Sequence, residues 1–254
     1  YWDLPTDRLR EPASAEEILE QLDRVVAEHM VADVPLGAFL SGGIDSTAVA
    51  TSMAAHSRSA LIACSVGFRE KDFDELDLAR ATAARLGAVH HTEVLDPDPT
   101  LATDVLPWIY DEPLADPSTV PSYLVSKMAR EHVTVALSGD GGDEIFAGYR
   151  RYVHDLAENR LRARLGRTGV NAAAAVGAHY PKLDWAPRFL RAKTFLSNLG
   201  RTPAQAYWRS VTQLDRESAL ELLAPDVARR LASHDPFEHF ERFYARPSVD
   251  DPLY

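Results

Sequence analysis

Short apolar runs alternate with amphipathic segments over residues 1–150. The runs that predict strands are 34–40, 61–68, 89–95 and 133–137. The segments that predict helices between them are one that ends near His56, then 74–86 with Gly87 behind it, 100–110 and 119–131. A further helix of about 20 residues should follow a capping box formed by Ser14 and Glu17. Strands that alternate with helices in this way predict a doubly wound α/β domain with a parallel sheet.

The pattern changes near Arg151, where Arg- and Ala-rich helical sequence begins and continues to the end of the chain. The residues at which we expect these helices to break are Gly166, Gly169, Pro181, Pro187, Pro203, Pro225 and Pro236. The expected organisation is therefore an α/β core over 1–150 and an all-helical continuation over 151–254.

Composition narrows the class of protein. With 46% hydrophobic and 26% charged residues, the 254-residue chain has the make-up of a soluble globular protein. Its net charge of −11 argues against non-specific binding to nucleic acid, so any polyanion must be held locally by backbone amides, a few cations or a metal ion. No apolar stretch is long enough for a membrane span, and we expect no membrane partner.

The ends of the chain and its one cysteine bear on its origin. A single cysteine, Cys64, cannot form a disulfide within the chain, which indicates a reducing compartment and hence the cytoplasm. It lies in an apolar run, which predicts a buried thiol. The chain begins with Tyr1 and has no closing element after Pro252. We therefore expect it to be part of a longer polypeptide.

The first candidate site is Ser-Gly-Gly-Ile-Asp-Ser-Thr at residues 41–47, between an expected strand and an expected helix. Two glycines allow close approach to a ligand, and the helix N-terminus directs free N–H groups at it, so the segment could hold phosphate. Asp45 in its middle would repel phosphates unless a cation lay between them, which implies Mg²⁺. The alternative is an ordinary strand-to-helix turn.

The second candidate site is Ser-Gly-Asp-Gly-Gly-Asp-Glu at residues 138–144, again behind an expected strand. Ligands of parallel sheets bind at the carboxyl ends of the strands, so both segments should lie at one edge. Asp140 and Asp143 are three residues apart and would face one ligand on a helix that contained both. The alternative is a solvated acidic turn.

Both segments resemble motifs of the glutamine-hydrolysing asparagine synthetases. Residues 34–47 are similar to the pyrophosphate loop of that family, and residues 137–149 to its second active-site motif. Residues 65–68 and 111–118 resemble two further motifs, in the same order along the chain. The loop alone would indicate only the wider group of N-type ATP pyrophosphatases, whose PP-loop fold is adenine nucleotide alpha hydrolase-like.

The resemblance implies an ATP-dependent ligase domain that activates aspartate to β-aspartyl-AMP and pyrophosphate, after which ammonia displaces AMP to give asparagine. By resemblance, Asp45 and Asp143 are the Mg²⁺ ligands. The residues that would hold pyrophosphate are Ser41, Gly42, Gly43, Asp45 and Ser46. Those that would line the nucleotide pocket are Leu40, Val66, Ser138 and Gly139. Asp140 would bind the amine nucleophile or accept its proton.

Two features depart from the family. Its glutaminase domain, expected in the full-length chain, has no counterpart here, and residues 1–5 resemble the junction that follows it. A lysine motif expected near the C-terminus also lacks a match, since Lys127, Lys182 and Lys193 do not fit it. The alternatives are therefore an amidotransferase or a beta-lactam synthetase-like enzyme for another carboxylate, and a non-catalytic nucleotide-binding fragment. A homo-oligomer stays open.

Two sets of aromatic residues are expected to be structural. His90 and His91 are neighbours in an expected strand, so their side chains should point to opposite faces and cannot chelate one metal ion together. The tryptophans Trp108, Trp185 and Trp208 fall in helical regions, and we expect them in the core.

Overall fold

The computed structural model describes residues 12–69, 74–95, 100–111, 114, 116–181, 185, 187 and 192–246. These fall into two compact units, one that ends at Asp143 and one that begins at Glu144. No helix in these ranges is both long and apolar enough to cross a membrane.

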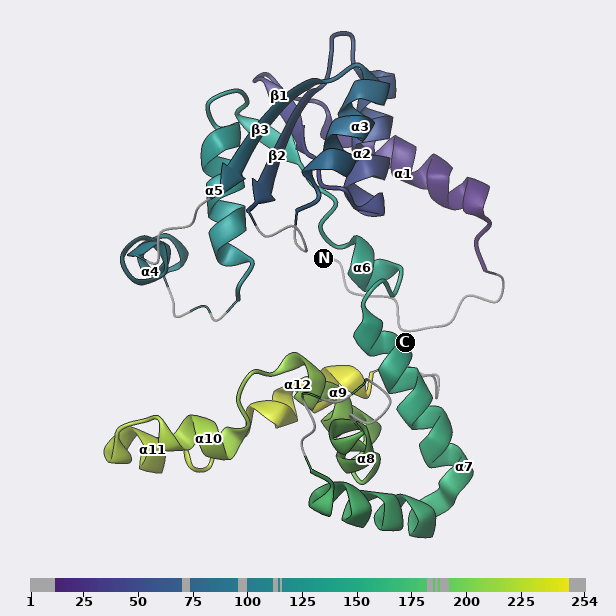
Figure 1. Ribbon diagram of the computed structural model, residues 1–254, viewed down its shortest axis with the longest axis vertical. Coiled ribbons are helices and arrows are strands. Elements are labelled where there is room, and N and C mark those ends of the chain that lie inside the picture. The colour runs from purple at the N-terminus through teal and green to yellow at the C-terminus, as the bar shows by residue number, and fades with distance from the viewer. Residues whose placement is uncertain are drawn as a thin grey trace. The chain divides into compact units, whose positions relative to one another are not determined.

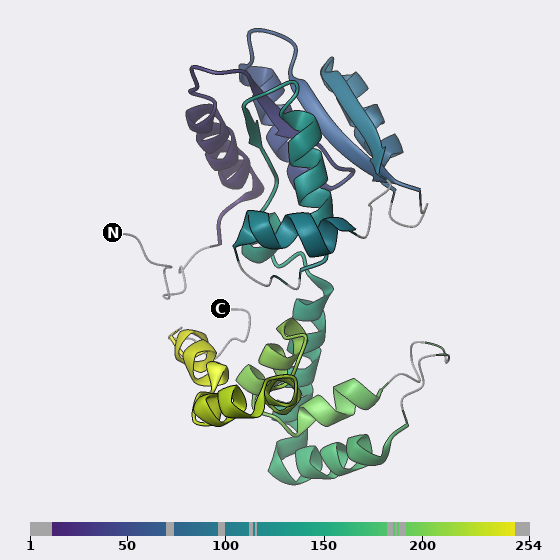
Figure 2. The ribbon, with the colours of Figure 1, turned by 90° about the vertical axis from the view of Figure 1, so that its left-hand side faces the viewer.

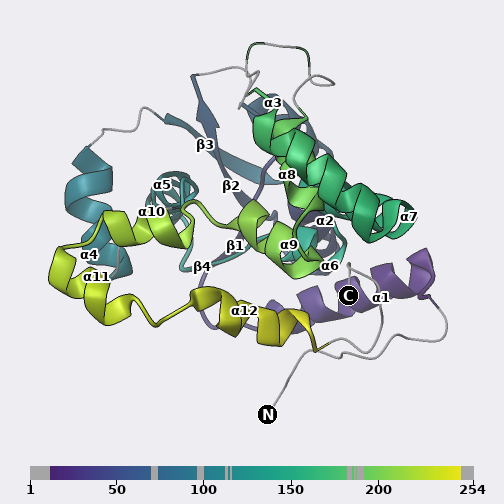
Figure 3. The ribbon, with the colours of Figure 1, turned by 90° about the horizontal axis from the view of Figure 1, so that it is seen from below.

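The first unit is built on a parallel sheet (Figures 1 and 2). Its strands are β1 Leu36–Phe39, β2 Ile62–Phe68, β3 Val89–Leu95 and β4 Val135–Leu137. They lie in the order β3-β2-β1-β4, which Figure 3 shows from another side. The expected α/β fold with a parallel sheet is confirmed.

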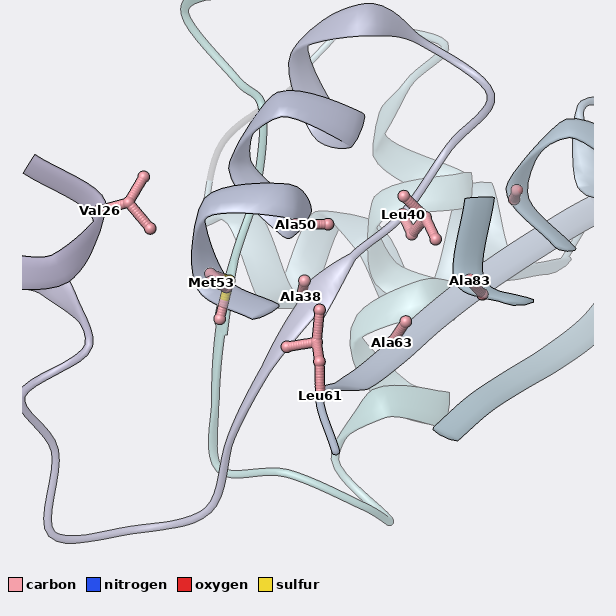
Figure 4. Packing of buried hydrophobic residues seen from close by; sticks show 9 residues of the cluster. Val26, Ala38, Leu40, Ala50, Met53, Leu61, Ala63 and Ala83 are labelled. Carbon is pink, nitrogen blue, oxygen red and sulfur yellow. The ribbon is translucent and has the colours of Figure 1, made fainter. Parts of the chain in front are cut away.

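Helices cover both faces of this sheet. They are α1 Ala15–His29, α2 Ile44–His56, α3 Leu76–Leu86 and α5 Thr119–Ala129. Val26, Ala50 and Met53 from α1 and α2 pack on β1 and β2 in the largest buried cluster (Figure 4). On the other face, Met128 and Ala129 pack against Cys64 of β2. Cys64 is 1% exposed, as expected, and burial raises the pKa of its thiol.

Local sequence signals set several helix ends. Ser14 and Glu17 form the expected capping box at the start of α1, and Gly87 ends α3 in a left-handed conformation with φ of 63°. The expected helix at 100–110 is instead a π-helical turn, Leu101–Val105, followed by the short α4, Leu106–Tyr110. Pro107 explains the change, because it has no N–H with which to continue an α-helical ladder.

The second unit is helical throughout its described residues. Behind α6, Gly142–Ile145, the helices are α7 Arg150–His179, α8 Lys193–Leu199, α9 Pro203–Val211, α10 Arg216–Glu221, α11 Pro225–Leu231 and α12 Pro236–Tyr244. Three of these begin at a proline, where its fixed φ fits the first helical turn. Gly166 interrupts α7 with a φ of 61°, but the expected break at Gly169 is wrong, since α7 continues through it.

The tryptophan expectation is largely wrong. Trp108 and Trp185 are each 84% exposed and lie outside the core. Trp208 is partly buried and packs against Phe237 and Phe240 of α12. Helical sequence was therefore a poor guide to burial, because α4 is short and buries Leu106 instead of its tryptophan.

A buried polar network joins α7 to α8. Glu158 accepts hydrogen bonds from Arg162, at 3.2 Å, and from Asn198, at 3.3 Å. Asp155, one turn earlier, is only 6% exposed and accepts a single 3.3 Å hydrogen bond, from Asn159. Burial, together with the charge of Glu158, raises the pKa of Asp155 to about 6. Asp155 is thus a buried carboxylate whose loss of hydration is compensated by few hydrogen bonds.

This raised pKa predicts a pH-dependent cost of folding. The native state holds a proton on Asp155 that the unfolded chain has lost, so stability falls as pH rises from about 4 to about 6. Asp155→Asn keeps the bond to Asn159 and should raise the free energy of unfolding at pH 7 by roughly 1–3 kcal/mol, with no gain at pH 4. Urea unfolding at both pH values measures this, and an equal effect at both would contradict it.

Candidate functional site

The loop that follows β1 in the sequence is folded back by hydrogen bonds to its own serine hydroxyl groups. Ser41 Oγ accepts a hydrogen bond from the Gly43 N–H at 3.0 Å and lies 2.8 Å from Ser46 Oγ, which also accepts from the Ser41 N–H. Gly43 is the N-cap of α2 and supplies no capping side chain. The first-turn N–H groups of α2 therefore keep the free donors and positive dipole end that suit an anion.

The loop behind β4 packs directly on the start of α2. A Cβ atom at Gly142 would lie 2.5 Å from Cγ of Asp45, and one at Gly139 would lie 2.5 Å from the N atom of Ser46. Only glycine leaves room for contacts this close. The two segments, nearly a hundred residues apart in sequence, therefore form one site.

Asp140 and Asp143 have different local settings. Asp140 is exposed, and its carboxylate accepts a 2.9 Å hydrogen bond from Ser138 Oγ. Gly141 then takes a φ of 92° and α6 begins at Gly142, so only Asp143 lies on the helix. The helix starts after Asp140 and so carries only one of the two carboxylates, and that both face one ligand stays a prediction.

Leu40, just before the first loop, is fixed by a chain of hydrogen bonds that runs through Ser65 to His90. Its N–H donates to the Cys64 carbonyl at 2.9 Å, and its own carbonyl accepts a hydrogen bond from the buried Ser65 hydroxyl. Because that hydroxyl proton is committed to Leu40, His90 Nε2, 2.7 Å from Ser65 Oγ, must be the donor. Burial, with the charges of Arg80 and His91, lowers the pKa of His90.

The neighbouring histidine has a different partner. His91 stacks on His132 with 3.5 Å between ring centroids, while His90 bonds to Ser65. This agrees with the expectation that the two histidines serve separate structural roles.

A carboxylate that the sequence did not single out reaches the first loop. Glu75, the residue before α3, accepts a 3.1 Å hydrogen bond from the Gly42 N–H. A negative oxygen thus occupies one of the amides that an anion would use. Asp74-Glu75 before a helix looks like an ordinary helix start, so only the packing of α3 against the loop could show this contact.

The residues expected to form the site are not all brought together. Those that lie in contact at the two loops are Ser41, Gly42, Gly43, Asp45, Ser46, Gly139 and the neighbouring Ser138. Leu40 lies directly behind them, while Val66 is in β2 and packs with the Cys64 cluster. Of the motif at 111–118, residues 112, 113 and 115 lie outside the described residues, as do residues 1–5 and Lys182.

The carboxylate of Asp45 is a group at this site that could bind a metal ion. This carboxylate lies against Gly142 and receives no hydrogen bond or ion pair from the described residues, so its oxygens stay available. The described residues hold no group of three or more His, Cys, Asp or Glu side chains that could bind a metal alone. Mg²⁺ commonly binds through one or two carboxylates together with substrate phosphates, which this arrangement fits.

The fold and the site together define a parallel α/β protein in which a glycine loop with an uncapped helix start and an adjacent carboxylate lie at the carboxyl ends of β1 and β4. The sequence profile of the asparagine synthase family matches residues 17–245. The chain therefore belongs to the asparagine synthase family.

Individual relatives agree with this assignment. The chain is 36% identical over 225 residues to glutamine-hydrolysing asparagine synthetase 1 of Bacillus subtilis, which covers 86% of this chain and 33% of that protein. It is 44% identical over 154 residues to a putative asparagine synthetase of Mycobacterium tuberculosis, covering 60% and 24%. The chain thus spans about a quarter to a third of the length of these relatives.

One solved structure is more distant. The NH3-dependent NAD synthetase of Campylobacter jejuni matches with a TM-score of 0.36 and 14% identity, over 75% of this chain and 98% of that one.

The contact between Gly142 and Asp45 predicts a coupled pair of substitutions. Gly142→Ala alone should cost about 0.5–1.5 kcal/mol of unfolding free energy, because its Cβ overlaps the Asp45 carboxylate and forces that side chain away from its present rotamer. In an Asp45→Ala background the overlapping atoms are gone, and the same change should cost only a few tenths of a kcal/mol. A double-mutant cycle in urea measures this, and equal costs in both backgrounds would contradict the geometry.

Proposed function

We propose that this chain is the synthetase domain of an asparagine synthetase-like amidotransferase, which activates aspartate with ATP and amidates the product with ammonia. The observation that carries the proposal is the contact of the two glycine loops at Asp45, which joins an anion-binding helix start to carboxylates at the strand ends. Membership of the asparagine synthase family supports the choice of substrates.

In the first step, the side-chain carboxylate of aspartate attacks the α-phosphorus of ATP, and the bond to the β-phosphate oxygen breaks. Pyrophosphate leaves and β-aspartyl-AMP remains. The amides of Gly42 and Gly43, the Ser46 hydroxyl and the start of α2 would hold the departing pyrophosphate, where negative charge develops. Leu40, Val66, Ser138 and Gly139 would line the nucleotide pocket.

Asp45 and Asp143 would hold Mg²⁺ beside these phosphates. The bound ion would supply charge neutralisation of the leaving pyrophosphate. Asp45 lies at the start of α2 and against Gly142, close to the amides that would hold the phosphates.

In the second step, ammonia attacks the acyl carbon and AMP leaves, with loss of one proton from the new amide nitrogen. Asp140 is the proposed acceptor of that proton. Its carboxylate is exposed, and the hydroxyl of Ser138 holds it by a 2.9 Å hydrogen bond. A fixed carboxylate near the nucleophile is what general-base catalysis requires.

The whole protein would obtain its ammonia from a glutaminase domain, as the names of the relatives suggest. The reduced, buried state of Cys64 is compatible with a cytoplasmic setting.

The proposal is tested by pyrophosphate release from Mg²⁺·ATP with aspartate and a panel of other carboxylic acids, each with ammonia. We expect release with aspartate and little with the others. Release with a different acid would move the protein to a tailoring amidotransferase or a beta-lactam synthetase-like enzyme. No release with any acid would contradict catalysis by this chain and favour a nucleotide-binding role.

Glu75 gives a second prediction, because its carboxylate must leave the Gly42 amide before a phosphate can use it. Glu75→Gln removes the repulsion and replaces a charge-assisted hydrogen bond with a neutral one. The affinity for Mg²⁺·ATP should rise by about 3- to 10-fold at low salt, measured by calorimetry.

The matched control is Asp77→Asn, in the first turn of the same helix, where the carboxylate pairs with Arg80 at 3.0 Å. It removes the same charge without touching the loop and should change affinity far less. Weaker binding in Glu75→Gln would instead make Glu75 part of the binding machinery.

A further inference from the structure

The helical unit contains a polar cavity that the proposed reaction does not use. Its volume is about 290 Å³, at the lower end of the range for small-molecule sites. The residues that line it are Arg151, His154, Asp155, Glu158, Thr194, Phe195, Asn198, Ala206 and Ser210. All belong to the unit that begins at Glu144.

The inner wall of this cavity is acidic and buried. Asp155, Glu158 and Asn198 are each 6% exposed, whereas His154, Thr194 and Ser210 are exposed and form its outer part. Glu158 is already neutralised by Arg162 and hydrogen-bonded by Asn198. Asp155 accepts only the 3.3 Å bond from Asn159 among the described residues, and the charge of Arg162, which pairs with Glu158, compensates this carboxylate only in part.

The side-chain amide of Asn198 gives independent evidence that the cavity lacks a hydrogen-bond donor. Its Nδ2 faces the Glu158 carboxylate, which can only accept, so the orientation of the amide is settled. Its Oδ1 is buried and has no hydrogen-bond partner in the described part of the chain. A buried unmatched acceptor is costly, and one beside an under-compensated carboxylate suits an ammonium group with several N–H donors.

Arg151 places a matching donor in the same cavity. Its guanidinium stacks over Tyr149, 3.8 Å from the ring centroid, and forms no ion pair with Asp155 although the two are four residues apart on α7. Its buried Nε has no partner among the described residues. The guanidinium also hydrogen-bonds the side chains of Tyr152 and Tyr207, so its unmatched donor is the Nε–H. The cavity therefore presents a cationic group with one unmatched N–H and, one helical turn away, a buried carboxylate that accepts a single hydrogen bond.

We propose that this cavity binds a small neutral α-amino acid, with the ammonium group on Asp155 and Asn198 and the carboxylate on Arg151. Phe195 and Ala206 would contact the side chain of the amino acid, and the cavity volume of about 290 Å³ favours a short side chain. A metal ion is a poorer fit, because no group of three metal-ligating side chains occurs among the described residues. The site lies outside the two glycine loops and would be a second, regulatory site.

The energetics of Asp155 support a binding role. Its pKa is raised by burial, so keeping the carboxylate there costs folding free energy. Asparagine has the same shape as aspartate and would avoid this cost. A residue that reduces stability although a neutral replacement would fit is typical of a functional position.

Calorimetry on the full chain without nucleotide tests the proposal, with L-alanine and L-asparagine as probes. Methylammonium and acetate are tested separately, because each represents one of the two charged groups of the amino acid. We expect binding of at least one amino acid at millimolar or lower concentration and weaker binding of either half. Asp155→Asn should weaken amino acid binding about tenfold or more while remaining folded. Arg151→Gln should reduce amino acid affinity to that of methylammonium.

The matched controls are Asp226→Asn on α11 and Arg160→Gln on α7, both exposed and outside the cavity. They should leave binding unchanged. Absence of binding by every probe, or equal affinity in wild type and Asp155→Asn, would overturn the proposal. Equal affinity for methylammonium and the amino acids would overturn the role of Arg151.

Discussion

The close approach of Gly139 and Gly142 to the first turn of α2 is the constraint on which the first unit depends. It requires β4 to lie beside β1, because only neighbouring parallel strands deliver both loops to one point. It also places the Asp45 carboxylate directly against Gly142. The same contact that packs the unit thus fixes the group on which its proposed chemistry rests.

The two units use polar groups differently. In the α/β unit, the hydroxyls of Ser41 and Ser46 bond to each other, and the exposed carboxylate of Asp140 accepts a hydrogen bond from Ser138. In the helical unit, Asp155 and Asn198 are buried with unmatched capacity. Such groups reduce stability, so a bound partner is the physical reason that best accounts for them.

The sequence predicted the features that depend on local pattern. Strand 89–95 and the capping box at Ser14 follow from periodicity and neighbouring residues, and both glycine loops lie at strand ends as expected. What it missed depends on contacts between distant elements: Glu75 reaching Gly42, and the burial of Asp155 against α8. The expected burial of Trp108 was wrong for the same reason, since helical spacing does not say which face of a helix is covered.

The central claim is that the two loops form one phosphate site that needs a metal ion at Asp45. Calorimetric titration of pyrophosphate, with and without Mg²⁺, into wild type and Asp45→Asn tests it most directly. We expect binding that requires Mg²⁺ in wild type and falls at least about tenfold in Asp45→Asn. Binding that is independent of Mg²⁺, or that is the same in both proteins, would contradict the account.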